Sequence, residues 1–391
     1  MIIGIVSDTH FGYSRWPEDA LKQGREAILK AAEEADVLLI PGDIFDKEKP
    51  SIDIISQLLN ILLELEDRGW GKNINVYDDQ GEKINCRLPI AVIRGTHERV
   101  EKNKTDPIEF VTLTKYWINV HNKGIVFEKE NEKLRIFGMG GVPEDLAKES
   151  IRYIDPKPKP NMFNMFVLHQ TFNELIPIHK EEFLCYENLP KNFDLYVNGH
   201  IHKQMCDLDG KFIIPGSTVI TQLKPEEQDP KGYILYDTER KTHEFREINS
   251  RPFVIKKLKF ENAKVEEVKE KIENEIQEIV NQHNFPIIRI IIQGNLVKGL
   301  KPTDIILNFS HPNAFKIYVD NQFEGQTIES TINKVKDIKK EFKDPKKIGY
   351  SILLEKLKDI DFKFKNIDEL FESIGESVDK GLEYVEETNL D

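Results

Sequence analysis

The chain has 391 residues, of which 39% are hydrophobic and 31% charged, and its formal net charge is -13 at pH 7. This length allows two or three domains with full hydrophobic cores, and the composition indicates a soluble globular protein. The negative charge argues against broad, unspecific binding of nucleic acid, which depends on neutralising phosphates. Because no apolar run approaches the ~18 residues that span a bilayer, and the sequence starts directly in a strand, we expect a cytoplasmic protein without a membrane partner.

The first part of the chain alternates short apolar strands with amphipathic helices, and later parts are dominated by short strands. Strands are expected at 1–6, 37–40, 90–93, 125–128, 134–138, 165–168, 195–197, 212–214, 233–236 and 244–248, and helices at 18–34, 51–66 and 144–153. Residues 69–88 interrupt this order, and we interpret them as a β-hairpin insertion, because a turn separates two short alternating runs. The order is typical of a layered α/β fold whose first domain covers residues 1–248.

A second, smaller α/β domain is expected at residues 249–325. Its pattern is an alternating strand, a helix at about 265–283 and a further strand, followed by two apolar runs at 305–309 and 315–319 that we interpret as strands. Residues 326–391 are polar and carry narrow apolar stripes at helical spacing. Short helices with one apolar stripe usually pack on another surface, so this helical tail is expected to contact the same chain or a partner.

Potential metal ligands follow the apolar strands of the first domain, at the point where each strand ends. These residues are Asp8 and His10, Asp43, His97, His169, and His200 with His202. Open α/β folds have their active sites at the carboxyl ends of the strands, so we expect these side chains to lie close together. The sequence therefore predicts one metal centre built from several strand ends.

A mixture of carboxylates and imidazoles suits manganese, iron or zinc better than magnesium, which prefers oxygen ligands. One carboxylate can bridge two ions about 3.5 to 4 Å apart, and such a pair generates hydroxide and stabilises an in-line displacement at phosphorus. Asp43 is the candidate bridging ligand.

The ordered motifs resemble those of the calcineurin-like metallophosphoesterases. These motifs are Asp8-x-His10, Gly42-Asp43, Gly95-x-His97-Glu98, His169 and Gly199-His200-Ile201-His202. Three further stretches resemble the double-strand-break repair nucleases, which are the bacterial SbcD type and the archaeal and eukaryotic meiotic-recombination-eleven nuclease. They are Asp8-Thr9-His10-Phe11-Gly12, Gly42-Asp43-Ile44-Phe45 followed by Lys49-Pro50-Ser51, and Pro215-Gly216-Ser217-Thr218 followed by Lys231-Gly232-Tyr233. The resemblance covers about residues 1 to 320.

This resemblance implies a four-layer α/β/β/α sandwich, a DNA-facing cap domain and a helical C-terminal tail. It implies two metal ions, most commonly Mn²⁺, and cleavage of DNA by 3′-to-5′ exonuclease and endonuclease activity. One ion would be held by Asp8, His10, Asp43 and His202, the other by Asp43, His169 and His200, and His97 would protonate the leaving oxygen. Proteins of this family act as homodimers that bind an SMC-like ABC ATPase through their C-terminal helices.

The chain departs from the family pattern at two positions. Thr96 replaces the usual asparagine that binds the second metal, and its hydroxyl is a poorer neutral ligand than an amide carbonyl. Asp46 stands where the nuclease branch often has histidine, which bears on the exonuclease step. Two alternatives remain open at this point: a phosphodiesterase or phosphatase for small molecules or cyclic nucleotides, and a non-catalytic scaffold of the same fold.

Overall fold

A computed structural model of the chain describes residues 1–100, 104–305, 307–323 and 366–376, with the single positions 350, 353, 380 and 384. Most of the expected tail at 326–391 therefore lies outside the described residues. Contacts divide the chain into two compact units. Unit 1 contains residues 1–255, 277–289 and 310–317, and unit 2 contains residues 256–276, 290–309 and 318–391. No helix in the described ranges is long and apolar enough to cross a membrane.

The first sheet has six strands in the order β13-β12-β1-β2-β4-β5. Their bounds are β1 Ile2–Ile5, β2 Val37–Pro41, β4 Ile90–Ile93, β5 Ile118–Asn119, β12 Gly232–Asp237 and β13 Thr242–Glu247. The strands β1, β2, β4 and β5 are parallel neighbours, whereas β12 and β13 are antiparallel. The parallel arrangement directs the ends of β1, β2 and β4 to the same edge.

Three helices cover one face of this sheet: α1 (Pro17–Glu34), α2 (Ile52–Asp67) and α3 (Pro107–Thr112). The α2 helix begins at Ser51, whose side chain accepts a hydrogen bond from the Ile54 N–H, and α3 begins at Asp106, which caps the Glu109 N–H. Their apolar faces bury Ala27, Leu62 and Ile108 against Leu38 and Ile90 of the sheet.

The second sheet has seven strands in the order β10-β11-β9-β8-β7-β6-β3. Their bounds are β3 Asn75–Asp78, β6 Gly124–Lys129, β7 Glu132–Met139, β8 Phe163–Leu168, β9 Leu195–Asn198, β10 Met205–Asp207 and β11 Phe212–Ile214. The outer face of this sheet packs on α4 (Glu144–Ile154) through a cluster that contains Ala147, Ile151 and Phe166. Within residues 69–88, β3 pairs with β6 and bridges to Lys83.

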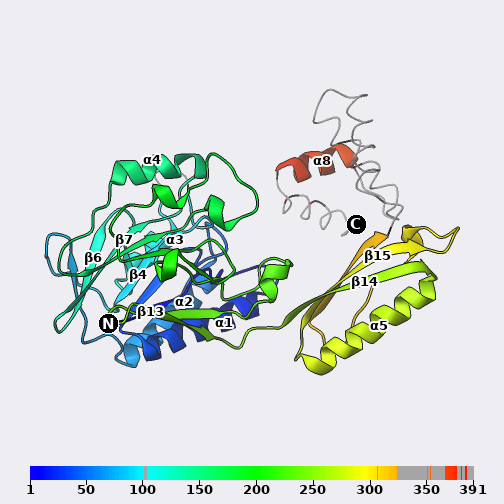
Figure 1. Cartoon of the computed structure of the whole chain (residues 1–391), viewed down its shortest axis with the longest axis horizontal. Helices are drawn as coiled ribbons and strands as arrows, with labels where there is room; N and C mark the ends of the chain where they lie inside the picture. Colours follow the sequence, from blue (N-terminus) through cyan, green and yellow to red (C-terminus); the bar gives the residue numbers. More distant parts are fainter. Residues whose placement is uncertain are drawn as a thin grey trace. The chain divides into compact units, whose positions relative to one another are not determined.

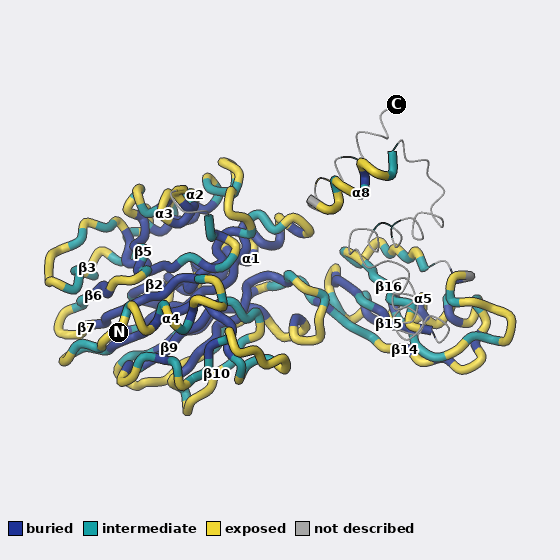
Figure 2. The backbone as a smooth tube through the Cα atoms, turned by 90° about the horizontal axis from the view of Figure 1, so that it is seen from above, coloured by how far each residue is buried: buried dark blue, intermediate teal, exposed yellow. Residues whose placement is uncertain are grey.

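The two sheets pack face to face. Ile3, Ile5 and Leu39 of the first sheet share one buried cluster with Met165 and Val197 of the second. Figure 1 shows the resulting layers, with α1 and α2 on one side of the sheets and α4 on the other, and Figure 2 shows that the central strands are buried. The expected four-layer α/β/β/α sandwich is confirmed.

The later part of the chain forms a three-stranded sheet in the order β14-β15-β16 with one helix. The bounds are β14 Phe253–Ala263, α5 Val265–Gln282, β15 Ile287–Leu296 and β16 Lys316–Phe323, and a further helix, α8, covers Ile367–Glu376. Val268, Ile272, Ile276 and Ile279 recur at helical spacing along α5 and are buried.

The strand expected at 305–309 is wrong for the described residues of that run. A 3-10 turn at Pro302–Asp304 precedes it, and the Ile305 N–H bonds back to the Pro302 carbonyl, so the apolar side chain of Ile305 is buried from an irregular segment. A short apolar run alone does not distinguish a strand from a buried loop. The pattern also missed α3, β5 and β10, which have six, two and three residues.

Candidate metal centre

Four strand ends, two from each sheet, supply the candidate ligands. Asp8 and His10 follow β1, and Asp43 follows β2, so these three come from the first sheet. His169 follows β8, and His200 and His202 follow β9, so these three come from the second sheet. The structure therefore brings together all six side chains that the sequence predicted, and it does so across the interface between the sheets.

Asp8, His10 and His202 form the first ligand group, in which the candidate ligand atoms all lie within 4.8 Å of one another. Nε2 of His10 lies 3.2 Å from Nε2 of His202, and the latter lies 3.6 Å from Oδ1 of Asp8. Two imidazole nitrogens and a carboxylate oxygen that face one point match the ligand set of a divalent transition metal ion.

Asp43, His169 and His200 form the second ligand group, with the same 4.8 Å limit. Nε2 of His169 faces Oδ2 of Asp43 at 3.1 Å. It is buried and has no hydrogen bond of acceptable geometry among the described residues. Buried ring nitrogens without a hydrogen bond are costly unless an ion occupies the space in front of them. The residues present therefore fit divalent metal ions.

Contacts on the far side of each imidazole fix which nitrogen faces the centre. Nδ1 of His169 lies 2.7 Å from the Pro41 carbonyl oxygen, which can only accept, so Nε2 carries the lone pair. Nε2 of His200 lies 3.1 Å from Oγ1 of Thr171, which itself donates to Glu144, so the lone pair of His200 is on Nδ1.

His202 is held by side chains of the segment after β11. Its Nδ1 lies 2.6 Å from Oγ1 of Thr221 and 3.4 Å from Oε1 of Glu227. Glu227 is in turn paired with Lys231, whose Nζ lies 2.6 Å from Oε2, and both side chains are buried. Burial opposes ionisation of Glu227, but His202 and Lys231 outweigh it and lower the pKa of this carboxyl to about 2.

The backbone at the candidate ligands adopts a conformation that is uncommon for residues other than glycine. The angle φ is 50° at Asp8, 45° at His10, 47° at Asp43 and 75° at His200. Each such residue is strained, and strain of this kind collects at functional sites because it aims a side chain that an extended strand would direct elsewhere.

Gly42 and Gly95 leave room for the centre. A Cβ at Gly42 would lie 2.5 Å from Nδ1 of His169, and a Cβ at Gly95 would lie 2.1 Å from Oδ1 of Asp43. Any side chain at either position would displace a candidate ligand.

Electrostatics differ between the two imidazoles of the second ligand group. Burial lowers the pKa of His169, but the Asp43 carboxylate outweighs it and raises that pKa to about 9. For His200, burial and then the neighbouring His169 lower the pKa to about 3, so its ring stays neutral, which is the form that binds metal. The pKa of Asp43 is well below its usual value, chiefly because His169 outweighs its burial.

His97 and Thr96 lie beside Asp43. The His97 N–H donates to Oδ1 of Asp43 at 2.9 Å, and the Thr96 hydroxyl lies 3.1 Å from Oδ2. Nδ1 of His97 lies 2.7 Å from the Asp46 carbonyl oxygen, so its Nε2 is the nitrogen available to a substrate. The His97 side chain is 44% exposed, whereas that of His169 is 0% exposed. This exposure distinguishes His97 from the six candidate ligands and suits contact with a substrate.

Sequence reasoning missed three residues that support the centre: Thr171, Thr221 and Glu227. It named Glu98 as part of a motif but predicted no role for it. Glu98 is fully buried and accepts hydrogen bonds from the Phe45 and Gly95 N–H groups, which ties the Asp43 loop to the His97 loop. Burial and then the charge of Asp43 raise the pKa of Glu98 to about 8. No spacing rule identifies Thr171, Thr221 and Glu227, because each acts through a contact with a residue that is distant in the sequence.

Comparisons with known proteins agree with this geometry. The sequence profile of the family described as calcineurin-like phosphoesterase matches residues 1–204. The double-strand break repair protein mre-11 of Caenorhabditis elegans is 28% identical over 282 residues, which are 59% of this chain and 38% of the worm protein. Two archaeal proteins named DNA double-strand break repair protein Mre11 are each 25% identical. The match to the Sulfurisphaera tokodaii protein covers 82% of this chain and 80% of the relative. The match to the Methanococcus maripaludis protein covers 84% and 88%.

The chain spans about two fifths of the length of the eukaryotic relatives that it matches. The match of the family profile covers more than half of the chain and includes every candidate ligand from Asp8 to His202. The α/β/β/α sandwich and the two ligand groups agree with that assignment. The chain therefore belongs to the calcineurin-like phosphoesterase family, whose members are metal-dependent phosphoester hydrolases.

Proposed function

We propose that the chain is a manganese-dependent DNA nuclease that acts in double-strand break repair. The observation that carries this proposal is the pair of ligand groups, each with one carboxylate and two imidazoles, beside the more exposed His97. The relatives above are double-strand break repair proteins by name, which supports DNA as the substrate.

Asp8, His10 and His202 would hold one ion, and Asp43, His169 and His200 the other, with Asp43 contributing to both. Bound there, two ions supply a hydroxide near neutral pH and stabilise the oxygens of an in-line displacement at phosphorus. Mixed carboxylate and imidazole ligation supports Mn²⁺ over Mg²⁺.

His97 would donate the proton to the leaving oxygen. Its Nδ1 is fixed by the Asp46 carbonyl oxygen at 2.7 Å, so Nε2 is presented to the substrate in a constant orientation. An imidazole is suited to this step because its pKa lies near neutral pH, and general acid catalysis of this kind contributes about 10²–10⁴-fold. The carboxylate of Asp46 lies on the same side of the ring, with Oδ1 3.9 Å from Nδ1 of His97.

The decisive experiment measures cleavage of end-labelled single- and double-stranded DNA by the purified chain with Mn²⁺, beside a chromogenic phosphodiester. We expect both 3′-to-5′ exonuclease products and internal cuts, and a loss of cleavage in His97→Ala while the bound manganese is retained. His243→Ala is the matched control, since His243 is exposed on β13. Cleavage of the small ester without cleavage of DNA would favour a small-molecule phosphodiesterase, and retained DNA cleavage by His97→Ala would refute the role of His97.

We also propose that the chain acts as a homodimer and with an SMC-like ABC ATPase. Exposed apolar side chains at the start of α2, on α3 and directly after α3 support an association of two copies: Ile52 is 81%, Phe110 49% and Leu113 71% exposed. Leu113→Glu is expected to give a monomer in size-exclusion chromatography with light scattering, while Tyr153→Glu on α4 leaves the mass unchanged. An unchanged mass in Leu113→Glu would exclude this surface.

The ATPase partner is tested separately, by measuring binding of the purified ATPase to the chain before and after deletion of residues 326–391.

A further inference from the structure

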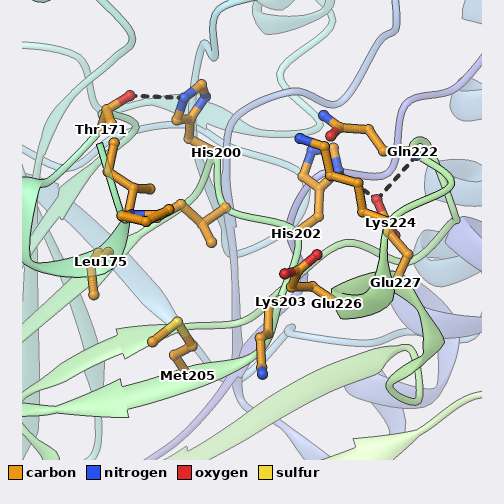
Figure 3. A pocket seen from close by; sticks show the side chains of 13 residues that line it. Thr171, Leu175, His200, His202, Lys203, Met205, Gln222, Lys224, Glu226 and Glu227 are labelled. Atoms are coloured by element: carbon orange, nitrogen blue, oxygen red, sulfur yellow. Dashed lines mark hydrogen bonds and ion pairs between the residues drawn. The ribbon is translucent and has the colours of Figure 1, made fainter. Parts of the chain in front are cut away.

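A cavity of about 550 Å³ adjoins the metal centre, and no step of the proposed hydrolysis uses it. His200 and His202 form part of its wall, so the cavity lies directly beside two of the candidate metal ligands. In Figure 3, Leu175 and Met205 lie on one side of this cavity and Gln222, Lys224 and Glu226 on the other, with His200 and His202 along one edge. Its size is within the range of pockets that bind small organic groups.

The side of the cavity that contains Leu175 is apolar, and its side chains pack against a buried hydrophobic cluster. Leu175, Ile201 and Met205 are half-buried and pack against the core cluster beneath the second sheet, which leaves their remaining surface to line the cavity. Ile176 and Pro177 continue this apolar wall. Water in contact with such a wall is readily displaced by a flat apolar group.

The opposite side carries balanced charge. Lys203 lies 3.5 Å from Asp229, Lys224 is offset by Glu226, and Glu227 is paired with Lys231. A pocket for a phosphate would have an excess of positive charge, which this one lacks. The Gln222 side chain offers an amide donor and acceptor at the same wall. An apolar wall opposite a side whose charges balance and which offers a neutral amide suits a heterocyclic base, which is flat and uncharged and has polar edges.

We propose that this cavity binds one unstacked nucleobase of the strand whose phosphate lies at the metal centre. The inference rests on the proposed nuclease function and specifies its substrate. A base is separated from the adjacent phosphate only by its sugar, and His200 and His202 belong both to the centre and to the cavity wall. A phosphate at the metals therefore places a neighbouring base at the apolar wall. Because a stacked base cannot enter, the favoured substrates are single strands and frayed ends.

The first test needs no variant. The wild-type protein with Mn²⁺ is given single-stranded oligonucleotides that differ only in the position of one abasic residue relative to the scissile phosphate. We expect kcat/KM to fall about tenfold when the missing base is at one specific position next to that phosphate, and to change less than twofold at positions farther away. Equal kcat/KM for all abasic positions would overturn the proposal, while the nuclease function would stand.

The second test fills the cavity. Leu175→Trp is expected to lower the ratio of oligonucleotide to chromogenic-ester kcat/KM about tenfold, and this loss should vanish with the substrate that lacks the critical base. Ile178→Trp is the matched control, because Ile178 is 66% exposed in the same loop and does not line the cavity. An equal loss on intact and abasic substrates would assign the effect to altered structure and overturn the proposal. If the wild-type protein cleaves the ester but no oligonucleotide, the nuclease function itself fails, and the nucleobase assignment fails with it.

Discussion

The two ligand groups have the same composition, one aspartate and two histidines, but they are supported in different ways. In the second group, His169 is fixed by a main-chain carbonyl of β2 and is fully buried. In the first group, His202 is fixed by the side chains of Thr221 and Glu227 and is 17% exposed. A main-chain contact persists as long as the sheet is folded, whereas a side-chain contact can be removed by one substitution. The support of His202 is therefore easier to change by substitution than the support of His169.

The largest expected effect comes from the residue that serves both groups. Asp43→Ala removes a ligand of both ions and the carboxylate that faces Nε2 of His169 at 3.1 Å. We expect manganese content and cleavage of any phosphodiester to fall below detection. Metal content is measured by elemental analysis after gel filtration, with Asp53→Ala on the exposed part of α2 as control. Metal content near wild type in Asp43→Ala would refute the bridging assignment.

A substitution of Glu227, which contacts His202, should lower the metal affinity of the first group alone. Glu227→Gln weakens the hold on Nδ1 of His202 and leaves the buried Lys231 without a counter-charge. We expect the affinity for one of two ions to fall by roughly 10–100-fold, as is usual when a group behind a metal ligand is lost. Isothermal titration with Mn²⁺ resolves the two binding events, and Glu226→Gln is the neighbouring control. An equal loss at both sites would contradict the separate support of the two groups.

Thr96 allows the opposite change in the second group. Thr96→Asn places an amide oxygen where the hydroxyl now lies 3.1 Å from Oδ2 of Asp43. Because an amide oxygen is a better neutral ligand, we expect the weaker of the two manganese affinities to rise by roughly tenfold or less. The same titration measures this gain. Affinities that stay at the wild-type values would show that Thr96 does not face the ion.

His121 provides a reference for pH effects outside both groups. Its Nδ1 accepts a hydrogen bond from the Gly140 N–H, and burial followed by the nearby Arg94 lowers its pKa from 6.5 to about 4. A group with a lowered pKa contributes stability above its unfolded value, and this stability is lost as pH falls from about 6.5 toward 4. Between pH 7 and pH 5 the loss is on the order of 1–2 kcal/mol.

Urea unfolding of the wild-type chain and of His121→Gln at both pH values measures this contribution. The variant should lose less stability over the same interval, by the amount that protonation of His121 costs. Equal losses in both proteins would assign the pH effect to other groups, such as those of the metal centre.

Strand periodicity predicted a layered α/β fold and the positions of the six candidate ligands, because each ligand follows closely on an apolar run. The four-layer sandwich was predicted by the family resemblance. Periodicity could not predict that His202 depends on Glu227, since that contact is made by a loop 25 residues later in the sequence. It also could not show the left-handed backbone at Asp8, His10 and Asp43, which the surrounding structure imposes. The run at 305–309 shows the limit of the same reasoning, because an apolar segment can be buried without becoming a strand.

Each ligand group combines residues from both sheets: Asp8 and His10 with His202, and Asp43 with His169 and His200. A bound ion at either position thus acts as a cross-link between two layers that are otherwise joined by apolar packing. Because the complete set exists only in the folded sandwich, ion binding adds its own free energy to folding, about 2.7 kcal/mol at a concentration of 100 times the dissociation constant. The chain should therefore melt at a lower temperature after a chelator has removed the ions. The ions of the proposed hydrolysis would then also stabilise the fold.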